Sequence, residues 1–328
     1  MRPPECTSPS GRADLHLAIV GPTASGKSEL AFEIARTCGD VEIVSLDSMQ
    51  VYRGMDVGTA KPNAIELASV PHHVIDVADP SEEWSVVRTQ TAAREAVATI
   101  EQRGRRALLV GGTGLYVQAV VDALEFPGED LTLRAELEAA TAEPGGVATA
   151  YAEIVAADPV GAARIDPHNV RRIVRALEVI RLTGRPFSSF GPGVDAYGPT
   201  VFPVRMVGVW LPRVVLAERI AARVDTMRAA GFVDEVVRLA GVAAPGGLSR
   251  TARQAIGYRE VLDALDPSGE ASDPARISEA LALTVRRTRA FARRQRMWFR
   301  RDPRISWFGT GNNPAELLPA LLAGWSPS

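Results

Sequence analysis

The chain has 328 residues, a net charge of −2 and a hydrophobic content of 46%. This length predicts two domains or one large domain with an insertion, and the charge excludes a protein that is basic overall. Two cysteines cannot build a disulfide framework or a zinc site, and no apolar run reaches the ~18 residues of a membrane helix, so we expect a cytoplasmic protein without membrane contact.

The chain is expected to begin with a disordered tail, residues 1–12, which lacks the apolar core of a signal peptide. A buried strand is predicted at residues 16–20 and a helix from Ser28 onward, with Leu30 and Ile34 on its apolar face. Between them the sequence reads G-x-x-x-x-G-K-S, the pattern of a phosphate-binding loop. The loop comprises Gly21, Pro22, Thr23, Ala24, Ser25, Gly26, Lys27 and Ser28.

Each part of this loop suits an anion. Its glycines let backbone amides turn toward a phosphate, and the helix N-terminus adds partial positive charge. Lys27 supplies a point charge, and Ser28 is a candidate Mg²⁺ ligand. No residue of the loop reads a base, so any diphosphate ester suits it. The alternative is a tight turn between strand and helix that carries a surface lysine.

Further strands are predicted at residues 41–46, 73–77, 106–110 and 204–210, with helical patterns such as 85–103 between them. Alternating strands and helices indicate an α/β fold with a largely parallel sheet, similar to the P-loop NTPase core. We assign residues 13–125 and 201–328 to this core. Residues 126–200 read as a mostly helical insertion domain, because the strand pattern stops there and an amphipathic helix ends at Gly184.

Asp47 follows the strand at 41–46 directly, so it is expected at the ligand-binding edge of the sheet. It could be an acid linked to Mg²⁺, a general base or a turn cap. The polar residues that follow it, Ser48, Gln50, Tyr52 and Arg53, are typical of groups that read a base edge. Lys61, the only lysine besides Lys27, closes a second tight loop and is either a phosphate ligand or a surface residue.

The second half of the chain adds hydroxyl and guanidinium groups. Thr113, in "VGGTGLY", follows a strand and could steady Asp47. Arg219 and Arg223 lie four apart on a predicted helix at 216–227, so both could clamp a diphosphate from the side opposite the loop. A helix is predicted at about 275–300. This C-terminal helical region carries nine arginines between Arg286 and Arg304, interleaved with Phe291, Trp298 and Phe299. This composition favours a nucleic-acid surface over a solvated helix face.

Several segments together resemble one family. "GPTASGKS", "DSMQVYRGMDVGTAKP", "PHHVIDV", "VGGTGLYVQA", "RRIVRALEV", "RVDTM" and "RQAIGYRE" occur in the order seen in bacterial tRNA dimethylallyltransferases. The resemblance extends from about residue 15 to residue 300. It implies transfer of a dimethylallyl group from dimethylallyl diphosphate to N6 of the adenosine 3′ to the anticodon. The acceptors would be tRNAs that read codons beginning with U, and Mg²⁺ would be the cofactor.

The resemblance also implies roles for individual residues. Asp47 is the expected base, assisted by Thr113, while Lys27 and either Arg219 or Arg223 hold the diphosphate. We expect a monomer that binds the anticodon stem-loop of tRNA. The implied tRNA contacts are Asp47, Ser48, Met49, Gln50, Arg134, Asn169, Val170, Arg171 and Arg172.

Three alternatives remain open from the residues themselves. A small-molecule kinase would use the same loop, with Asp47 on its metal. A prenyltransferase could act on free adenine nucleotides instead of tRNA. A non-catalytic nucleotide switch or RNA-binding module would not need the Asp47 carboxylate for its function.

Overall fold

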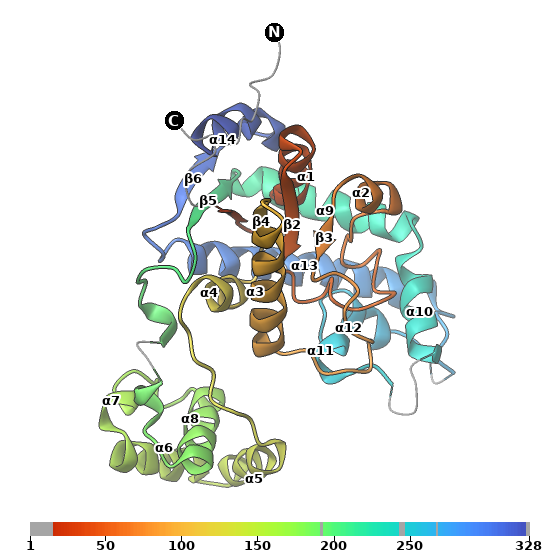
Figure 1. The fold of residues 1–328 in the computed structure, drawn as a ribbon. Helices are drawn as coiled ribbons and strands as arrows, with labels where there is room; N and C mark the ends of the chain where they lie inside the picture. The colour runs from red at the N-terminus through yellow and green to blue at the C-terminus, as the bar shows by residue number, and fades with distance from the viewer. Residues whose placement is uncertain (1–15, 191–192, 243–246, 267, 326–328) are drawn as a thin grey trace. The chain divides into compact units, whose positions relative to one another are not determined.

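The computed structural model describes residues 16–190, 193–242, 247–266 and 268–325, so the expected tail at 1–12 lies outside the described residues. The chain forms two compact units (Figure 1). The first consists of Met1–Asp122 and Pro199–Ser328, and the second is Ala123–Gly198. The sequence boundaries for the insertion, 126–200, differ from these by a few residues at each end.

The first unit contains a parallel six-stranded sheet in the order β3-β2-β4-β1-β5-β6. This confirms the α/β fold class. The prediction of a strand at 73–77 is wrong, because only His72–His73 pair and Val74 and Asp76 adopt left-handed φ angles of 62° and 55°. The sixth strand was not predicted. The strands are β1 His16–Val20, β2 Val41–Ser45, β3 His72–His73, β4 Arg106–Gly111, β5 Val204–Trp210 and β6 Ser306–Gly309.

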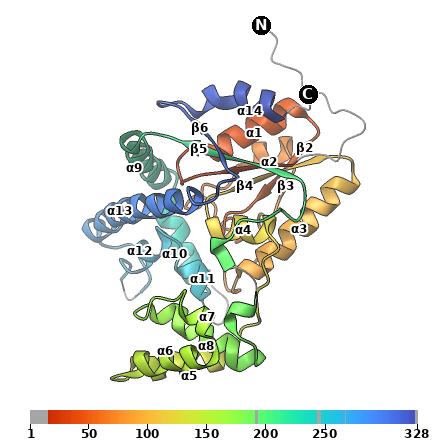
Figure 2. The same cartoon turned by 90° about the vertical axis from the view of Figure 1, so that its left-hand side faces the viewer.

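Both faces of the sheet are covered, which explains why its central strands are almost wholly apolar. Successive residues of β1 alternate between two cores: Leu17 and Ile19 face helices α1 and α14, whereas Ala18 and Val20 face the larger core. That larger core includes buried residues of α3, α4, α10, α12 and α13. Figure 2 shows α1 with α14 on one side of the sheet and α3 with α13 on the other. The helices of this unit are α1 Lys27–Cys38, α2 Ala64–Ser69, α3 Val86–Gln102, α4 Gly114–Val121, α9 Arg213–Ala229, α10 Phe232–Val242, α11 Arg250–Arg253, α12 Tyr258–Leu262, α13 Pro274–Phe299, η3 Pro314–Leu317 and α14 Leu318–Trp325.

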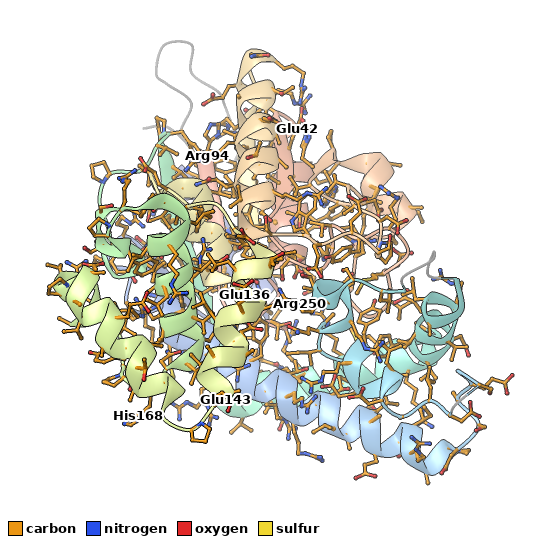
Figure 3. The ribbon with its side chains drawn as sticks, turned by 90° about the horizontal axis from the view of Figure 1, so that it is seen from below. Glu42, Arg94, Glu136, Glu143, His168 and Arg250 are labelled. Atoms are coloured by element: carbon orange, nitrogen blue, oxygen red, sulfur yellow. The ribbon has the colours of Figure 1, made fainter. Side chains whose placement is uncertain are left out.

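Arg94 on α3 (Figure 3) ties α3 to the end of α4. Its guanidinium donates to the carbonyl oxygens of Ala119, Val120 and Asp122, at 3.0, 3.1 and 2.6 Å. These carbonyls end a helix and would otherwise lack partners, so a cation there also complements the helix dipole. The contact fixes α4, the helix that directly follows the candidate residue Thr113.

The second unit is helical and has its own small core, which includes Leu137, Ile154, Ile173 and Leu177. The predicted helix that ends at Gly184 is confirmed: α8 is capped by Asn169 at its start and by Gly184 at its end, with φ 65°. Of the helices in the described residues of the whole chain, none combines the length and apolar character needed to cross a bilayer. The elements of this unit are α5 Leu131–Ala142, α6 Gly146–Ala157, α7 Pro159–Ala162, α8 Val170–Thr183, η1 Phe187–Ser189 and η2 Gly193–Asp195.

Candidate active site

The phosphate loop connects β1 to α1, as its pattern predicts. Gly21, Ala24 and Gly26 take positive φ angles of 145°, 62° and 85°. At Gly26 any Cβ would lie 2.4 Å from the ring of Pro314, so only glycine fits. The hydroxyl of Ser25 is buried and has no hydrogen-bond partner among the described residues. A buried polar atom without a partner is costly, which is consistent with a loop shaped for a ligand.

Lys27 lies in this loop with only 9% of its surface exposed. Its Nζ donates to the carbonyl oxygen of Pro22 at 2.7 Å, and no carboxylate of the described residues forms an ion pair with it. The pKa of Lys27 is lowered to about 7, chiefly by burial and also by the nearby charge of Arg223, while Asp47 acts in the opposite direction. The cation is therefore held out of water without a full counter-charge, and an anion bound there would stabilise it.

The two arginines of α9 differ in their surroundings. Arg219 donates from Nε to the carbonyl oxygen of Ala24 at 2.9 Å and lies 3.5 Å from Glu29. Among the described residues, Arg223 makes a single long hydrogen bond, 3.5 Å, to the carbonyl oxygen of Thr59. Burial lowers the pKa of Arg223, while Asp47 and Glu29 raise it. Arg219 thus braces the phosphate loop, and Arg223 faces Lys27 and Asp47 with its hydrogen-bonding capacity largely unused.

Asp47 lies just beyond the end of β2, where Leu46 still donates to the carbonyl oxygen of Val110 at 2.8 Å. Because β2, β4 and β1 are neighbours, their carboxyl ends bring Asp47, the Gly112–Thr113 turn and the phosphate loop to one edge of the sheet. One carboxylate oxygen, Oδ1, accepts from the amide of Met49 at 2.9 Å and so caps the local turn. The half-buried carboxylate retains Oδ2 for another partner.

Tyr116 on α4 lies within electrostatic reach of Asp47. The pKa of its phenol is raised to about 12, chiefly by burial, with smaller contributions from Tyr52 and Asp47. It is therefore a neutral hydroxyl near the carboxylate. Thr113, the residue before α4, makes no capping bond with its side chain, so its hydroxyl is not used by the helix.

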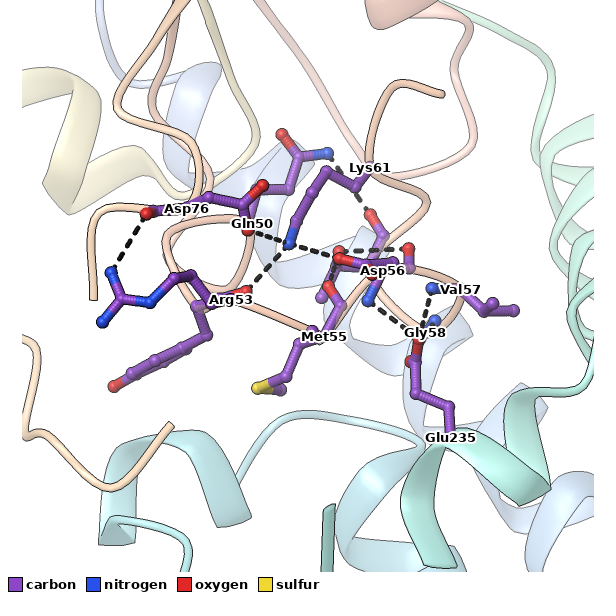
Figure 4. Close-up of polar contacts among 12 residues, drawn as sticks. Gln50, Arg53, Met55, Asp56, Val57, Gly58, Lys61, Asp76 and Glu235 are labelled. Atoms are coloured by element: carbon purple, nitrogen blue, oxygen red, sulfur yellow. Dashed lines mark hydrogen bonds and ion pairs between the residues drawn. The ribbon is translucent and has the colours of Figure 1, made fainter. Parts of the chain in front are cut away.

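The second loop, residues 47–62, holds itself together (Figure 4). Gln50 accepts from the hydroxyl of Ser45 at 2.8 Å and donates to the carbonyl oxygens of Thr59 and Ala60, each at 3.3 Å. Tyr52 is fully buried. Gln50 and Tyr52 therefore build the loop, whereas Ser48 and Met49 are half-buried beside Asp47.

Lys61 is a structural residue of this loop and does not point to a phosphate site. Its side chain is 3% exposed, and Nζ donates to Asp56, Asp76 and the carbonyl oxygen of Tyr52 at 2.6, 2.6 and 2.8 Å. Glu235 on α10 clasps the same loop by accepting from three successive amides, those of residues 56, 57 and 58, at 2.9, 2.8 and 3.1 Å.

Gln295 on α13 joins two loops of the site and was not anticipated from the sequence. Its Oε1 accepts from the amide of Thr23 at 2.8 Å, and its Nε2 donates to the carbonyl oxygen of Gly112 at 2.8 Å. Gly112 leaves room for this contact, since a Cβ there would lie 2.6 Å from Nε2. The sequence signal that could have pointed to Gln295 is its place as an uncharged polar residue between arginines, in "RRQR" at residues 293–296.

The arginine-rich region is only partly paired. Arg287 binds Glu260, and Arg304 binds Asp122 and Asp302. Two of the three aromatic residues of the helix turn inward instead of serving as a base platform: Phe299 is 2% exposed, and Trp298 covers Gly114, whereas Phe291 is half-buried. No carboxylate of the described residues pairs with Arg286, Arg293, Arg294, Arg296 or Arg300.

The residues expected to contact tRNA in the second unit fall into two groups. Arg134 is engaged by the buried Glu178 at 2.8 Å and lies 3.6 Å from Glu129, so it supports its own unit. Asn169 caps α8 by accepting from the amide of Arg172 at 3.2 Å. Val170, Arg171 and Arg172 are exposed at the positive end of that helix.

Metal ligands are sparse. The described residues contain no group of three or more His, Cys, Asp or Glu side chains arranged to hold a metal ion. Ser28 is exposed at the first turn of α1, next to Lys27. A hydroxyl with few carboxylates suits Mg²⁺, which takes much of its coordination from phosphates and water.

Comparison with known proteins places these features in a family. The model of the IPP transferase family matches residues 50–302. A tRNA dimethylallyltransferase of Salinispora arenicola is 50% identical over 309 residues, covering 94% of this chain and 86% of that protein. One of Streptomyces coelicolor is 48% identical over 305 residues, covering 93% of each.

Solved structures agree with this result. A tRNA isopentenylpyrophosphate transferase from Bacillus halodurans has 38% identity and a TM-score of 0.65, with 95% of this chain and 96% of that chain covered. A eukaryotic dimethylallyltransferase acting on tRNA has 25% identity and a TM-score of 0.76, with 95% and 78% covered. The family resemblance in the sequence is thereby confirmed, and the chain belongs to the IPP transferase family.

Proposed function

We propose that this protein transfers a dimethylallyl group from dimethylallyl diphosphate to N6 of the adenosine 3′ to the anticodon of tRNA, releasing diphosphate. Named relatives at close to half identity over nearly the whole chain support this activity. One structural observation carries it: the buried Lys27 and the half-buried Arg223 have no paired carboxylate among the described residues, and both lie within electrostatic reach of Asp47.

The cations suit the leaving group. As the bond between C1 of the allyl group and the diphosphate oxygen breaks, negative charge grows on that oxygen. Fixed cations and loop amides stabilise this charge without having to reorganise. Lys27 takes up a full positive charge next to the dianion, and Arg223 meets it from α9. Arg219 keeps the loop in position through Ala24.

The carboxylate suits the acceptor. The N6 lone pair is delocalised into the adenine ring, so the amine is a weak nucleophile and depends on being positioned next to C1. As the N6–C1 bond forms, the amine loses a proton, which Asp47 accepts through its free oxygen. Tyr116 contributes a neutral hydroxyl near this carboxylate, and Thr113 would assist from the neighbouring turn at the same edge of the sheet. The adenosine must leave its stack to reach the site.

Mg²⁺ fits this site as a partner of the diphosphate. Ser28 would hold it, and the buried hydroxyl of Ser25 adds a polar group to the same loop. When bound, the ion would offset negative charge on the leaving diphosphate. We further propose that Val170, Arg171 and Arg172 bind the tRNA backbone, since they are exposed and the arginines have no paired carboxylate among the described residues.

The decisive experiment incubates the purified chain with labelled dimethylallyl diphosphate and tRNA that lacks the modification, followed by nucleoside analysis. We expect label on N6 of the adenosine 3′ to the anticodon, and none on a tRNA with guanosine at that position. Transfer of label from γ-labelled ATP to a metabolite would instead identify a kinase. Efficient prenylation of AMP in competition with tRNA would identify a nucleotide prenyltransferase.

A further inference from the structure

A second cationic pocket lies outside the site described above. It has a volume of about 350 Å³ and is lined by Trp210, Arg296, Arg300 and Trp307, which we call the Trp–Arg pocket. Trp210 ends β5, Trp307 lies on β6, and the two arginines come from the end of α13 and the residue after it. None of these side chains contributes to the phosphate loop or to the surroundings of Asp47.

The pairing of β5 with β6 builds the aromatic wall of the pocket. In the register of the two strands Gly208 pairs with Trp307, and Trp210 pairs with Gly309. A Cβ at Gly208 would lie 2.6 Å from the Trp307 ring, and one at Gly309 would lie 2.9 Å from the Trp210 ring. Each indole thus lies over the glycine of the neighbouring strand, on the same face of the sheet. Both remain more than a third exposed, at 37% and 36%.

No carboxylate in the described part of the chain pairs with the arginines of the pocket. The Nε of Arg296 is buried and has no hydrogen-bond partner among the described residues. Burial lowers the pKa of Arg296, and Arg213 and Arg300 lower it further. Its guanidinium lies 5.4 Å from the centre of the Trp210 ring. Two guanidinium groups, those of Arg296 and Arg300, therefore line the pocket with an exposed indole, and an unpartnered N–H points to a missing acceptor.

This combination matches the chemistry of an unpaired nucleotide. Guanidinium groups bind a phosphodiester, and an exposed indole stacks on any base. A free mononucleotide could make the same contacts, but the unpaired cations extend beyond the pocket. Arg286, Arg293 and Arg294 are exposed on the same helix and have no carboxylate partners in the described part of the chain. A row of this kind suits a continuous polyanion.

We propose that the Trp–Arg pocket binds an unpaired nucleotide of the tRNA, apart from the adenosine that reacts, with its base on Trp210 and its phosphate on Arg296 and Arg300. This inference rests on the proposed function, because it takes the RNA substrate from it. The pocket would raise affinity for tRNA without touching the prenyl donor.

The test compares R296Q/R300Q with wild type for binding of unmodified tRNA in the absence of donor, across a range of salt concentrations. We expect Kd to rise about tenfold or more and the salt slope to flatten by about 1 to 2, as for the loss of two phosphate contacts. The KM for dimethylallyl diphosphate should stay unchanged. Arg36→Gln is the matched control, since Arg36 lies on α1, on the opposite face of the sheet, and pairs with Glu33 there.

Trp210→Ala supplies a second variant, and Arg300→Gln alone, at an exposed position, guards against a folding defect. Both should weaken tRNA binding while thermal melting stays as in wild type. Unchanged tRNA affinity in R296Q/R300Q would overturn the proposal. Prenylation of tRNA by the wild-type protein would in that case still support the proposed function. The proposal is also overturned if the variant raises the donor KM alone, or if AMP quenches Trp210 fluorescence as effectively as tRNA. A wild-type chain that fails to bind tRNA at all would refute the proposed function itself.

Discussion

The two lysines of this chain lie in two loops and illustrate opposite uses of a buried cation. Lys61, in the second loop, is surrounded by Asp56, Asp76 and a carbonyl oxygen, all within 2.8 Å. Lys27, in the phosphate loop, has one carbonyl partner and a pKa lowered to about 7, chiefly by burial. Both side chains are hidden from solvent, yet only Lys61 has its counter-charges supplied by the protein.

The presence or absence of carboxylate partners distinguishes a buried cation with a structural role from one that is available to bind a ligand. A buried charge is costly unless it is paired, and removal of one partner from a buried pair leaves the other uncompensated. The second loop therefore depends on Lys61 for its shape. The phosphate loop holds Lys27 without such a pair among the described residues, and under the proposed function the diphosphate would supply the missing charge. Asp47 is the exception within the second loop, since it keeps one oxygen free.

The largest expected effect comes from Asp47→Asn. If Asp47 accepts the proton from N6, its loss should lower turnover by about 10³-fold, in the range typical of general bases. Binding of tRNA should largely survive, because the amide keeps the size and one acceptor oxygen of the carboxylate. Single-turnover kinetics and tRNA binding measure the two separately. Asp56→Asn, on the same loop but paired with Lys61, serves as the control and should retain turnover.

Lys27→Met should lower turnover by about 10²-fold or more, as for loss of one preorganised donor to a developing anion. In wild type, the donor KM should rise as pH increases above about 7, because free Lys27 then loses its proton and the diphosphate must restore it. Lys27→Arg, which keeps its charge at high pH, should lose this dependence. A donor KM in wild type that is flat from pH 6 to 9 would contradict the role of Lys27.

The same methionine substitution should change stability in opposite directions at the two lysines. The pKa of Lys27 is lower in the folded protein than its ordinary value of 10.5, so its destabilising effect grows as pH falls from 10.5 toward 7 and is then constant. Lys27→Met should therefore raise the free energy of unfolding at pH 7, by on the order of 2 kcal/mol. Lys61→Met should lower it by about 2 kcal/mol, since its carboxylates are partly exposed and screened. Denaturant unfolding measures the change in the free energy of unfolding for each variant. If the two changes have the same sign, the distinction between the two loops is wrong.

The smallest expected effect is at Gln295, which positions the phosphate loop against the Gly112 turn. Gln295→Met removes both hydrogen bonds while keeping side-chain length, and should lower kcat about tenfold, equivalent to about 1.4 kcal/mol. The donor KM should rise less, since the loop amides and Lys27 remain. Gln295→Glu should recover only the bond from Thr23. If both variants keep the kcat of wild type, the phosphate loop does not depend on α13 for its position.

The sequence predicted correctly those elements whose structure depends on residues close together in the chain. The strands β1, β2, β4 and β5, the helix ending at Gly184 and the phosphate loop follow from periodicity and turn residues. The roles of Lys61 and Gln295 do not, because their partners come from other elements: Asp76 lies fifteen residues from Lys61, and Gly112 lies 183 residues from Gln295. β6 escaped prediction because four residues, "SWFG", carry little pattern. The strand expected at 73–77 failed because Lys61 binds Asp76 in a left-handed turn.

The contact between Gly26 and Pro314 makes the phosphate loop depend on a segment far along the chain. Pro314 begins η3, and the residues after it, Leu317, Leu321, Leu322 and Trp325, pack on the same face as α1. Glycine at 26 and proline at 314 form a matched pair, so exchange of either residue calls for a compensating change at the other. For protein engineering, substitutions in this segment therefore offer a way to change the rigidity of the phosphate loop without altering the loop's own residues.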